Sequence, residues 1–156
     1  GSLRLSWLWA ERKKIRILHF HYVQQFYAYK QTKVRLDWVL RLGRNLVLAK
    51  LMGYKIVFTL HNLTPSYPLK PGWVDYLGHW LTIQIANRVI VHCEEASRLL
   101  KKKYGRSRQV KIVPHPSFTG IYLNTIHKEE ARKQLELVIT QFVFLYFGGI
   151  RPNKCV

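Results

Sequence analysis

Short apolar runs that end in histidine recur along the chain and alternate with longer amphipathic stretches. The clearest run covers residues 55–60 and stops at His61 and Asn62, before a proline-containing loop. A short apolar run bounded by turn-forming residues is typical of a buried strand. Three other runs end in the same way: 15–18 before His19 and His21, 88–91 before His92, and 110–114 before His115. We therefore predict four strands, each of which delivers histidine to its carboxyl end.

Longer segments between and around these runs have helical character. Residues 34–52 repeat apolar side chains at helical spacing and are followed by Gly53, a residue type that commonly ends helices. The other predicted helices cover residues 3–9, 73–87, 94–104 and 128–137, and residues 142–147 are predicted to form a fifth strand. Strands that alternate with helices form a mostly parallel sheet wrapped by helices. Ligands bind at the edge where the strands of such a sheet end, so the histidines are expected at a binding edge.

The residues around the first strand carry further candidate binding groups. His19 and His21 are two positions apart, which places both on one strand face if the strand continues, facing either the core or an acceptor. Residues 22–29 are too aromatic and polar for an ordinary linker. We interpret them as a binding loop that leads into a helix.

Charge is the most unusual feature of the composition. The 156 residues include 26 Lys and Arg but only 8 Asp and Glu, which gives a formal net charge of +18. Such a field attracts nucleic acid, anionic lipid headgroups or phosphorylated ligands. With 48% hydrophobic residues the chain can bury one core, and it has no uncharged apolar run of about 18 residues that would span a membrane. Its two cysteines, Cys93 and Cys155, lack metal or redox spacing and favour a reducing compartment.

The predicted helix over 34–52 is both basic and amphipathic. Its cations are Arg35, Arg41, Arg44 and Lys50. Trp38 and Leu42 widen its apolar surface, so it lies either in a lipid interface or in the core with a solvated basic face. The same alternatives apply to residues 3–9, where two tryptophans precede a basic cluster. An anionic membrane surface is therefore one expected partner.

Five motifs, in this order, resemble a retaining GT-B glycosyltransferase of the large family that uses nucleotide-sugar donors. They are His61-Asn62-Leu63 after a strand, Val89-Ile90-Val91-His92-Cys93-Glu94, Val113-Pro114-His115, Gly120-Ile121-Tyr122 with Asn124-Thr125-Ile126, and Phe147-Gly148-Gly149-Ile150-Arg151-Pro152-Asn153-Lys154. The likeness covers the chain from about residue 15 onward.

The resemblance implies an α/β fold, a Rossmann-like open, mostly parallel sheet with helices on both faces, which is one half of a GT-B fold. Residues 1–140 would be the N-terminal acceptor domain without its first strand. Residues 141–156 would be the linker and the opening strand and loop of a donor-binding domain that is otherwise missing. The implied function is transfer of a sugar from a nucleotide-sugar to a glycan or lipid-linked acceptor with retention. This fragment is expected to be inactive alone.

The resemblance also assigns site residues. His61 matches the catalytic-site histidine beside the donor sugar, and Lys154 matches the lysine that contacts the donor diphosphate. The usual Gly-Arg pair is Gly148-Gly149 here and the glycine after the lysine is Cys155, so Arg151 is expected to supply the second phosphate contact. Expected on the acceptor side of the cleft are His19, His21, Asn62, His92, Glu94 and His115.

No cofactor is expected, because the nucleotide-sugar is a substrate and glycosyl transfer of this kind demands no metal. Imidazoles and amides can orient hydroxyl groups, while Lys and Arg neutralise a leaving diphosphate. A histidine cluster would alternatively bind zinc, but these histidines follow separate strands and form no local paired-ligand motif. The alternative for His61 itself is a hydrogen-bonded structural histidine.

Two other functions fit parts of the sequence. One is a basic nucleic-acid-binding module, although the scattered cations favour only non-specific binding. The other is a catalytically inactive, membrane-associated interaction domain. The expected location is the cytoplasm, with peripheral attachment to the cytoplasmic face of the membrane as the alternative.

Overall fold

The computed structural model describes residues 3–29, 33–63, 69–117, 120–122, 125–138, 140–146 and 148. It divides into two compact units, Gly1–His115 and Pro116–Val156, which are treated separately below. The division at residue 140 expected from the family resemblance stays a prediction.

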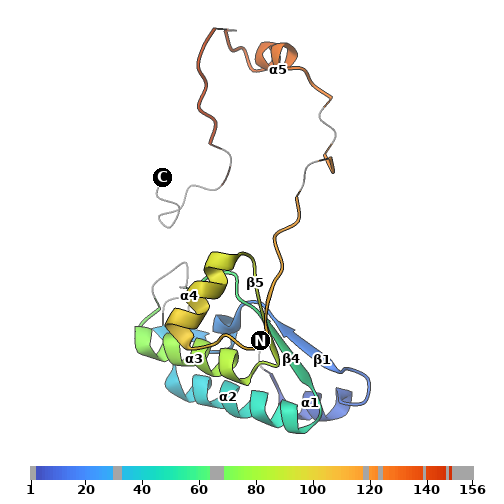
Figure 1. Cartoon of the computed structure of the whole chain (residues 1–156), viewed down its shortest axis with the longest axis vertical. Helices are drawn as coiled ribbons and strands as arrows, with labels where there is room; N and C mark the ends of the chain where they lie inside the picture. The colour runs from blue at the N-terminus through green and yellow to red at the C-terminus, as the bar shows by residue number, and fades with distance from the viewer. Residues whose placement is uncertain are drawn as a thin grey trace. The chain divides into compact units, whose positions relative to one another are not determined.

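The first unit alternates helices and strands along the chain (Figure 1). Its elements are α1 (Leu5–Glu11), β1 (Ile17–Phe20), the 3-10 helix η1 (Val23–Phe26), β2 (Ala28–Tyr29), β3 (Lys33–Val34), α2 (Leu36–Leu51), β4 (Lys55–Thr59), α3 (Gly72–Ile85), β5 (Arg88–Val91), α4 (Glu94–Tyr104) and β6 (Val110–Ile112). The four strands predicted from the histidine-ending runs are all present. The aromatic segment after β1 forms η1 and β2, and β2 pairs antiparallel with β3 before α2 begins.

Four strands form one parallel sheet in the order β1-β4-β5-β6. Its register pairs Leu18 with Ile56, Phe58 with Val89, and Val91 with Ile112. Helices α2, α3 and α4 connect consecutive strands and contact the sheet. The prediction of a Rossmann-like, open, parallel α/β sheet is confirmed.

Helix ends follow the sequence signals closely. Helix α2 ends at Leu51, and Gly53 follows with a φ of 94°. Helix α4 ends at Tyr104, and Gly105 adopts the left-handed conformation at a φ of 70° that glycine tolerates best. Acidic residues occupy the first turn of α4 and lysines its last turn, which matches the helix dipole at both ends.

The core lies against one face of the sheet. Alternate strand residues on that face are buried: Leu18, Phe20, Ile56, Phe58, Val89 and Val91. The other face is more open, because Ile17 is 59% exposed and Val57 and Ile90 are only half-buried. Tyr54 ties α1 to the unit by donating its hydroxyl to the Leu8 carbonyl at 2.7 Å.

In the second unit, helix α5 (Lys128–Gln134) is shorter than predicted, and the predicted fifth strand is wrong. Residues 142–146 are irregular, and residue 147 lies outside the described residues. Phe142 and Phe144 are 84% and 91% exposed, so their side chains are not packed into a core. A strand needs a neighbour to satisfy its N–H and C=O groups, and an apolar sequence alone does not supply one.

A helix that spans a membrane needs both length and apolarity. None of the helices in the described part of the chain has both the length and the apolarity needed to cross a bilayer.

Candidate functional site

The parallel sheet brings five histidines to its carboxyl edge. His19 lies within β1, and His21 follows that strand. His61 lies two residues beyond β4, His92 directly follows β5, and His115 lies three residues beyond β6. Since all four strands run in the same direction, their ends meet at one edge of the sheet.

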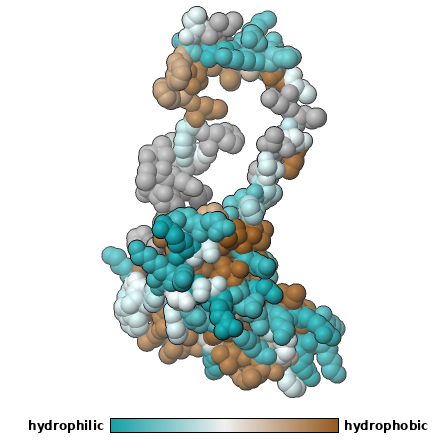
Figure 2. Space-filling view, in the orientation of Figure 1, coloured by the Kyte–Doolittle hydropathy of each residue, from teal (hydrophilic) through white to brown (hydrophobic). Residues whose placement is uncertain are grey.

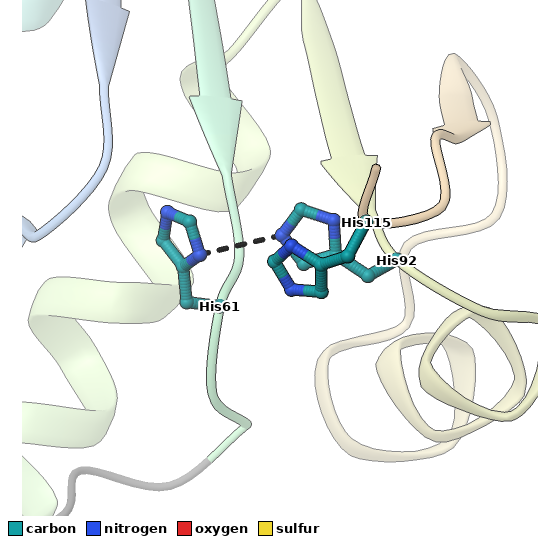
Figure 3. Close-up of side chains that lie close together, drawn as sticks. All are labelled: His61, His92 and His115. Atoms are coloured by element: carbon teal, nitrogen blue, oxygen red, sulfur yellow. Dashed lines mark hydrogen bonds between the residues drawn. The ribbon is translucent and has the colours of Figure 1, made fainter. Parts of the chain in front are cut away.

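The five imidazoles form a continuous series of ring contacts. The ring centroids of His19 and His21 are 4.3 Å apart, and those of His21 and His61 are 5.2 Å apart. His61 lies 5.1 Å from His92, and His92 stacks on His115 at 3.8 Å. Figure 3 shows the last three rings gathered together although they come from different strands.

Hydrogen bonds fix the direction of this series when the rings are neutral. The Nδ1–H of His92 donates to the carbonyl oxygen of Val113 at 2.9 Å, so its Nε2 carries a lone pair. That Nε2 accepts from Nδ1 of His61 at 3.3 Å. Nε2 of His61 then accepts from Nδ1 of His21 at 2.9 Å. The donors therefore run in one direction, from His21 to the Val113 carbonyl.

The environment favours neutral imidazoles at two positions. Burial, followed by the charge of neighbouring His21, lowers the pKa of His19 below its usual 6.5. Burial also lowers the pKa of His61, and four neighbouring histidines, of which His92 has the largest effect, lower it further. His19 is held in place by a 2.8 Å hydrogen bond between its Nε2 and the hydroxyl of buried Thr59.

Two of the other predicted site residues, Asn62 and Glu94, lie near this edge. Asn62 follows His61 and is exposed, and exposed Glu94 is the first residue of α4. The predicted phosphate-binding residues, Arg151 and Lys154, lie outside the described residues. The structure thus brings the histidines together in one cluster, and the roles assigned to all these residues stay predictions.

Two residues of the site were not singled out from the sequence. The ring of Tyr22 stacks on His61 at 5.0 Å with an interplanar angle of 17°. Its only sequence signal was membership of the aromatic segment 22–29. Thr59, which holds His19, gave no signal, because a threonine inside a strand is ordinary.

A buried polar network beneath the edge was also missed. The hydroxyl of Tyr27 donates to Oδ1 of Asp75 at 2.9 Å, and Nδ1 of His79 lies 3.5 Å from the same carboxylate oxygen. Gln24 donates from Nε2 to Nε2 of His79 at 3.0 Å. Burial, reinforced by Asp75, raises the pKa of Tyr27, so its hydroxyl stays protonated and able to donate. The network joins the segment after β1 to α3. It could not be predicted from the sequence, because a histidine within an apolar helical pattern gives no sign of its hydrogen-bond partners.

Three of the histidines have the geometry of a metal-binding group. One ring nitrogen from each of His61, His92 and His115 lies within 4.8 Å of the others. Their separation in the sequence argued against a metal site, but the sheet removes that separation in space. Imidazole nitrogen is a common ligand of zinc and similar transition metals.

Comparison with known proteins supplies no family: the chain matches no protein-family model, and a search of curated proteins finds no match. The α/β fold and the histidine edge therefore carry the functional argument, together with the motif resemblance seen in the sequence.

Proposed function

We propose that this chain is the acceptor-binding domain of a retaining glycosyltransferase that uses a nucleotide-sugar donor. The observation that carries the proposal is the position of His61, beyond central strand β4 and between His21 and His92 at the carboxyl edge of an open parallel sheet. Ligands of such sheets bind outside this edge. The order of the five motifs suggests the reaction, because by that resemblance His61 corresponds to the histidine that lies beside the donor sugar in this family.

The proposed chemistry uses neutral imidazoles. An acceptor hydroxyl must lie near the anomeric carbon while the bond from that carbon to the diphosphate breaks. A neutral imidazole can accept a hydrogen bond from one hydroxyl and donate to another, which suits polyhydroxylated ligands. Tyr22, stacked on His61, adds an aromatic surface on which the apolar face of a sugar can pack. Arg151 and Lys154 keep their predicted roles toward the donor diphosphate.

A lipid-linked acceptor would require the domain to reach a membrane surface, and α2 offers a suitable face. Four exposed apolar residues recur on that helix at spacings of four, seven and four: Leu36, Leu40, Val47 and Leu51. We call these residues the α2 stripe. Figure 2 shows hydrophobic surface along the lower side of the first unit, where Figure 1 places α2. We propose that the α2 stripe and its flanking cations hold the domain on an anionic leaflet, on the cytoplasmic side.

Ligand binding at the edge tests the acceptor proposal directly. The protein, labelled with nitrogen-15 in its histidines, is titrated with a panel of monosaccharides, oligosaccharides and glycolipid headgroups. We expect at least one glycan to shift the ring signals of His61 and His21 at millimolar concentration, because its hydroxyl groups would exchange with the hydrogen bonds that join these rings to their neighbours. His61→Ala should weaken binding of that glycan about 10-fold, since one direct hydrogen bond is lost.

The matched control is His127→Ala, which removes an exposed histidine from the second unit. It should leave the glycan affinity unchanged. A panel in which no glycan moves the His61 signal, or equal weakening by both substitutions, would contradict the proposal.

A further inference from the structure

We infer that His61, His92 and His115 form a binding site for a divalent transition-metal ion of the Zn²⁺ class. This inference rests on the geometry of the three side chains and does not depend on the proposed glycosyl transfer. The ligand atoms already lie within 4.8 Å of one another on three separate strand ends (Figure 3).

The distances are close to those of a zinc centre. Zinc binds histidine nitrogen at about 2.0–2.1 Å, and tetrahedral geometry then separates two ligand nitrogens by roughly 3.3 Å. Nδ1 of His61 and Nε2 of His92 are 3.3 Å apart. These two atoms are therefore already at the spacing that a shared ion requires, without movement of the strands.

The third ligand needs only a side-chain adjustment. His115 is exposed, and its ring stacks on that of His92 at 3.8 Å with an interplanar angle of 25°. Ring nitrogens bind metals in the plane of the ring, so His115 must turn out of this stack before its lone pair and that of His92 meet at one ion. The ring nitrogen of His115 already lies within 4.8 Å of the other two ligand atoms. Rotation of this exposed side chain can shorten that distance to the roughly 3.3 Å that separates two ligands of a tetrahedral zinc ion.

A second observation points to metal binding by His92. Its Nδ1–H donates to the Val113 carbonyl at 2.9 Å, which leaves Nε2 as the lone-pair atom that faces His61. Metal-binding histidines typically anchor the opposite ring nitrogen to a carbonyl or carboxylate in this way. The anchoring carbonyl belongs to the segment directly after β6, so the backbone itself orients the ligand.

His21 can accommodate the change of tautomer that binding requires. His61 must present a lone pair at Nδ1, so its ring proton must lie on Nε2, where it is donated to Nδ1 of His21 across the existing 2.9 Å contact. His21 then carries its own proton on Nε2. Both rings stay neutral, because the proton on Nδ1 of His61 passes to water, the proton on Nδ1 of His21 passes to Nε2 of His61, and water supplies the proton on Nε2 of His21. His21 thus acts as a positioning residue for the metal ligand.

Three histidines leave a fourth tetrahedral position for water or an oxygen ligand. No carboxylate or thiolate belongs to this ligand group in the described ranges of the chain. Zinc sites with three protein ligands and an open position bind anionic or hydroxyl oxygen at that position. The ligand class expected there is therefore a small oxygen donor, such as a phosphate or a sugar hydroxyl.

Zinc titration of the whole chain tests the site. The protein is purified without a histidine tag, stripped with a chelator, and titrated with Zn²⁺ against a chromophoric competitor. We expect about one ion per chain with micromolar or tighter affinity, because three imidazoles bind together. His92→Ala and His115→Ala should each weaken binding at least about 10-fold, and His21→Ala about 10-fold through loss of orientation.

Exposed His115 provides the variant least able to disturb folding, and circular dichroism checks each protein. His127→Ala is the matched control and should bind zinc as the unaltered protein does. Loss of binding in His115→Ala with retained fold supports the site. Equal affinity in the unaltered protein and His115→Ala, or equal loss in His127→Ala, would overturn it. Glycan binding is measured separately without metal, so the two proposals can fail independently.

Discussion

At the scale of single residues, the histidines at the carboxyl edge of the sheet alter one another's protonation, and the effect is clear at His19 and His61. Burial makes a positive charge costly at His19 and His61, and the neighbouring imidazoles add to this cost. The pKa values of both residues are consequently lowered. Neutral rings can accept hydrogen bonds and bind metals, which protonated rings cannot do, so the lowered pKa values favour the chemically useful form of His19 and His61 near neutral pH.

This crowding predicts a loss of stability on mild acidification. The pKa of His19 is lower in the folded protein than its usual 6.5, so the unfolded chain binds more protons once the pH falls below 6.5. Stability rises with pH wherever the unfolded state binds more protons, so it should fall from pH 6.5 toward the lower folded pKa. His61 acts in the same direction. Denaturant unfolding at about pH 7.5 and about pH 5.5 measures this change above the range where carboxylates titrate.

The variant His19→Asn should show a smaller loss of stability over the same pH interval, because one of the two shifted groups is removed. His127→Asn, altered in the other unit, should lose as much as the unaltered protein. A free energy of unfolding that does not change between the two pH values would contradict this account.

At the scale of elements, the contact between Tyr27, which directly follows η1, and helix α3 depends on a glycine. A Cβ atom added to Gly78 would lie 2.7 Å from Cε1 of Tyr27, far inside normal contact distance. Tyr27 is completely buried and donates a hydrogen bond to Asp75, so its ring cannot easily move away. Glycine at this helical position therefore permits the close approach that carries the buried polar network.

We expect Gly78→Ala to destabilise the protein. Overpacking costs about 1–3 kcal/mol, and strain on the hydrogen bond to Asp75 adds to it, which together exceed the helix-propensity gain of about 1 kcal/mol. Gly72→Ala is the matched control, since nothing lies within 4 Å of its added Cβ. It should leave stability unchanged or raise it slightly. Chemical denaturation of both variants measures the difference, and equal stability would rule out the steric explanation.

Helix α2 also corrects one detail of the sequence analysis. Leu42, expected to widen a lipid-facing surface, is 4% exposed and belongs to the core. Trp38 is half-buried. The apolar residues available to a membrane are instead the α2 stripe. Of the helix cations, Arg35 is paired with Asp37 at 3.0 Å, so its attraction to lipid phosphate is partly cancelled.

Vesicle co-sedimentation tests the membrane proposal. Each cation near an anionic leaflet contributes about 1 kcal/mol, so the unaltered protein should bind phosphatidylserine-rich vesicles better than neutral ones. Changing Arg35, which precedes α2, and the α2 cations Arg41, Arg44 and Lys50 to glutamine should remove most of this preference.

The control changes four cations elsewhere, Arg98, Lys101, Lys102 and Arg108, to glutamine, which gives the same net charge. It should retain more binding than the α2 variant if α2 is the docking helix. Equal losses in the two variants would attribute binding to net charge alone, and equal binding of all proteins to both vesicle types would refute docking.

At the scale of the whole molecule, the net charge of +18 dominates long-range behaviour. In the described ranges of the chain the cations are spread over α2, α4 and α5 and the segments around these helices, and no helix or strand there collects them into a motif that would read a nucleic-acid groove. A diffuse positive field binds polyanions through counterion release, which is insensitive to sequence.

We therefore expect nucleic-acid binding to be weak, equal for unrelated sequences, and strongly salt-dependent. Fluorescence anisotropy with two duplexes of equal length and different sequence should give equal affinities. Both should fall at least about 10³-fold between about 50 and about 200 mM salt if six or more phosphates are contacted. Sequence-selective binding that persists at physiological salt would instead favour the nucleic-acid-binding module.

The periodicity of the sequence predicted most of the first unit, because strand runs, helix spacing and glycine stops are local signals. The common edge of the histidines followed from parallel topology. The order of hydrogen bonds from His21 to Val113 and the network around His79 could not be predicted, because they depend on contacts between distant segments. The prediction of a strand over 142–147 was wrong for the same reason. The apolar pattern is a local feature of the sequence, whereas a strand also needs a partner strand from a distant segment.

Strand β1 ends the sheet on one side, so one edge of its backbone has no neighbouring strand among the described residues. Its amide and carbonyl groups on that side offer a template to any extended chain, and 59% exposed Ile17 adds an apolar contact beside them. Two copies that pair along β1 would satisfy each other's backbone. Electrostatic repulsion between highly cationic molecules opposes this encounter, and salt screens that repulsion. Storage buffers of high ionic strength would then promote dimers or larger aggregates, so the solubility of the protein is set by a competition between its charge and its open strand.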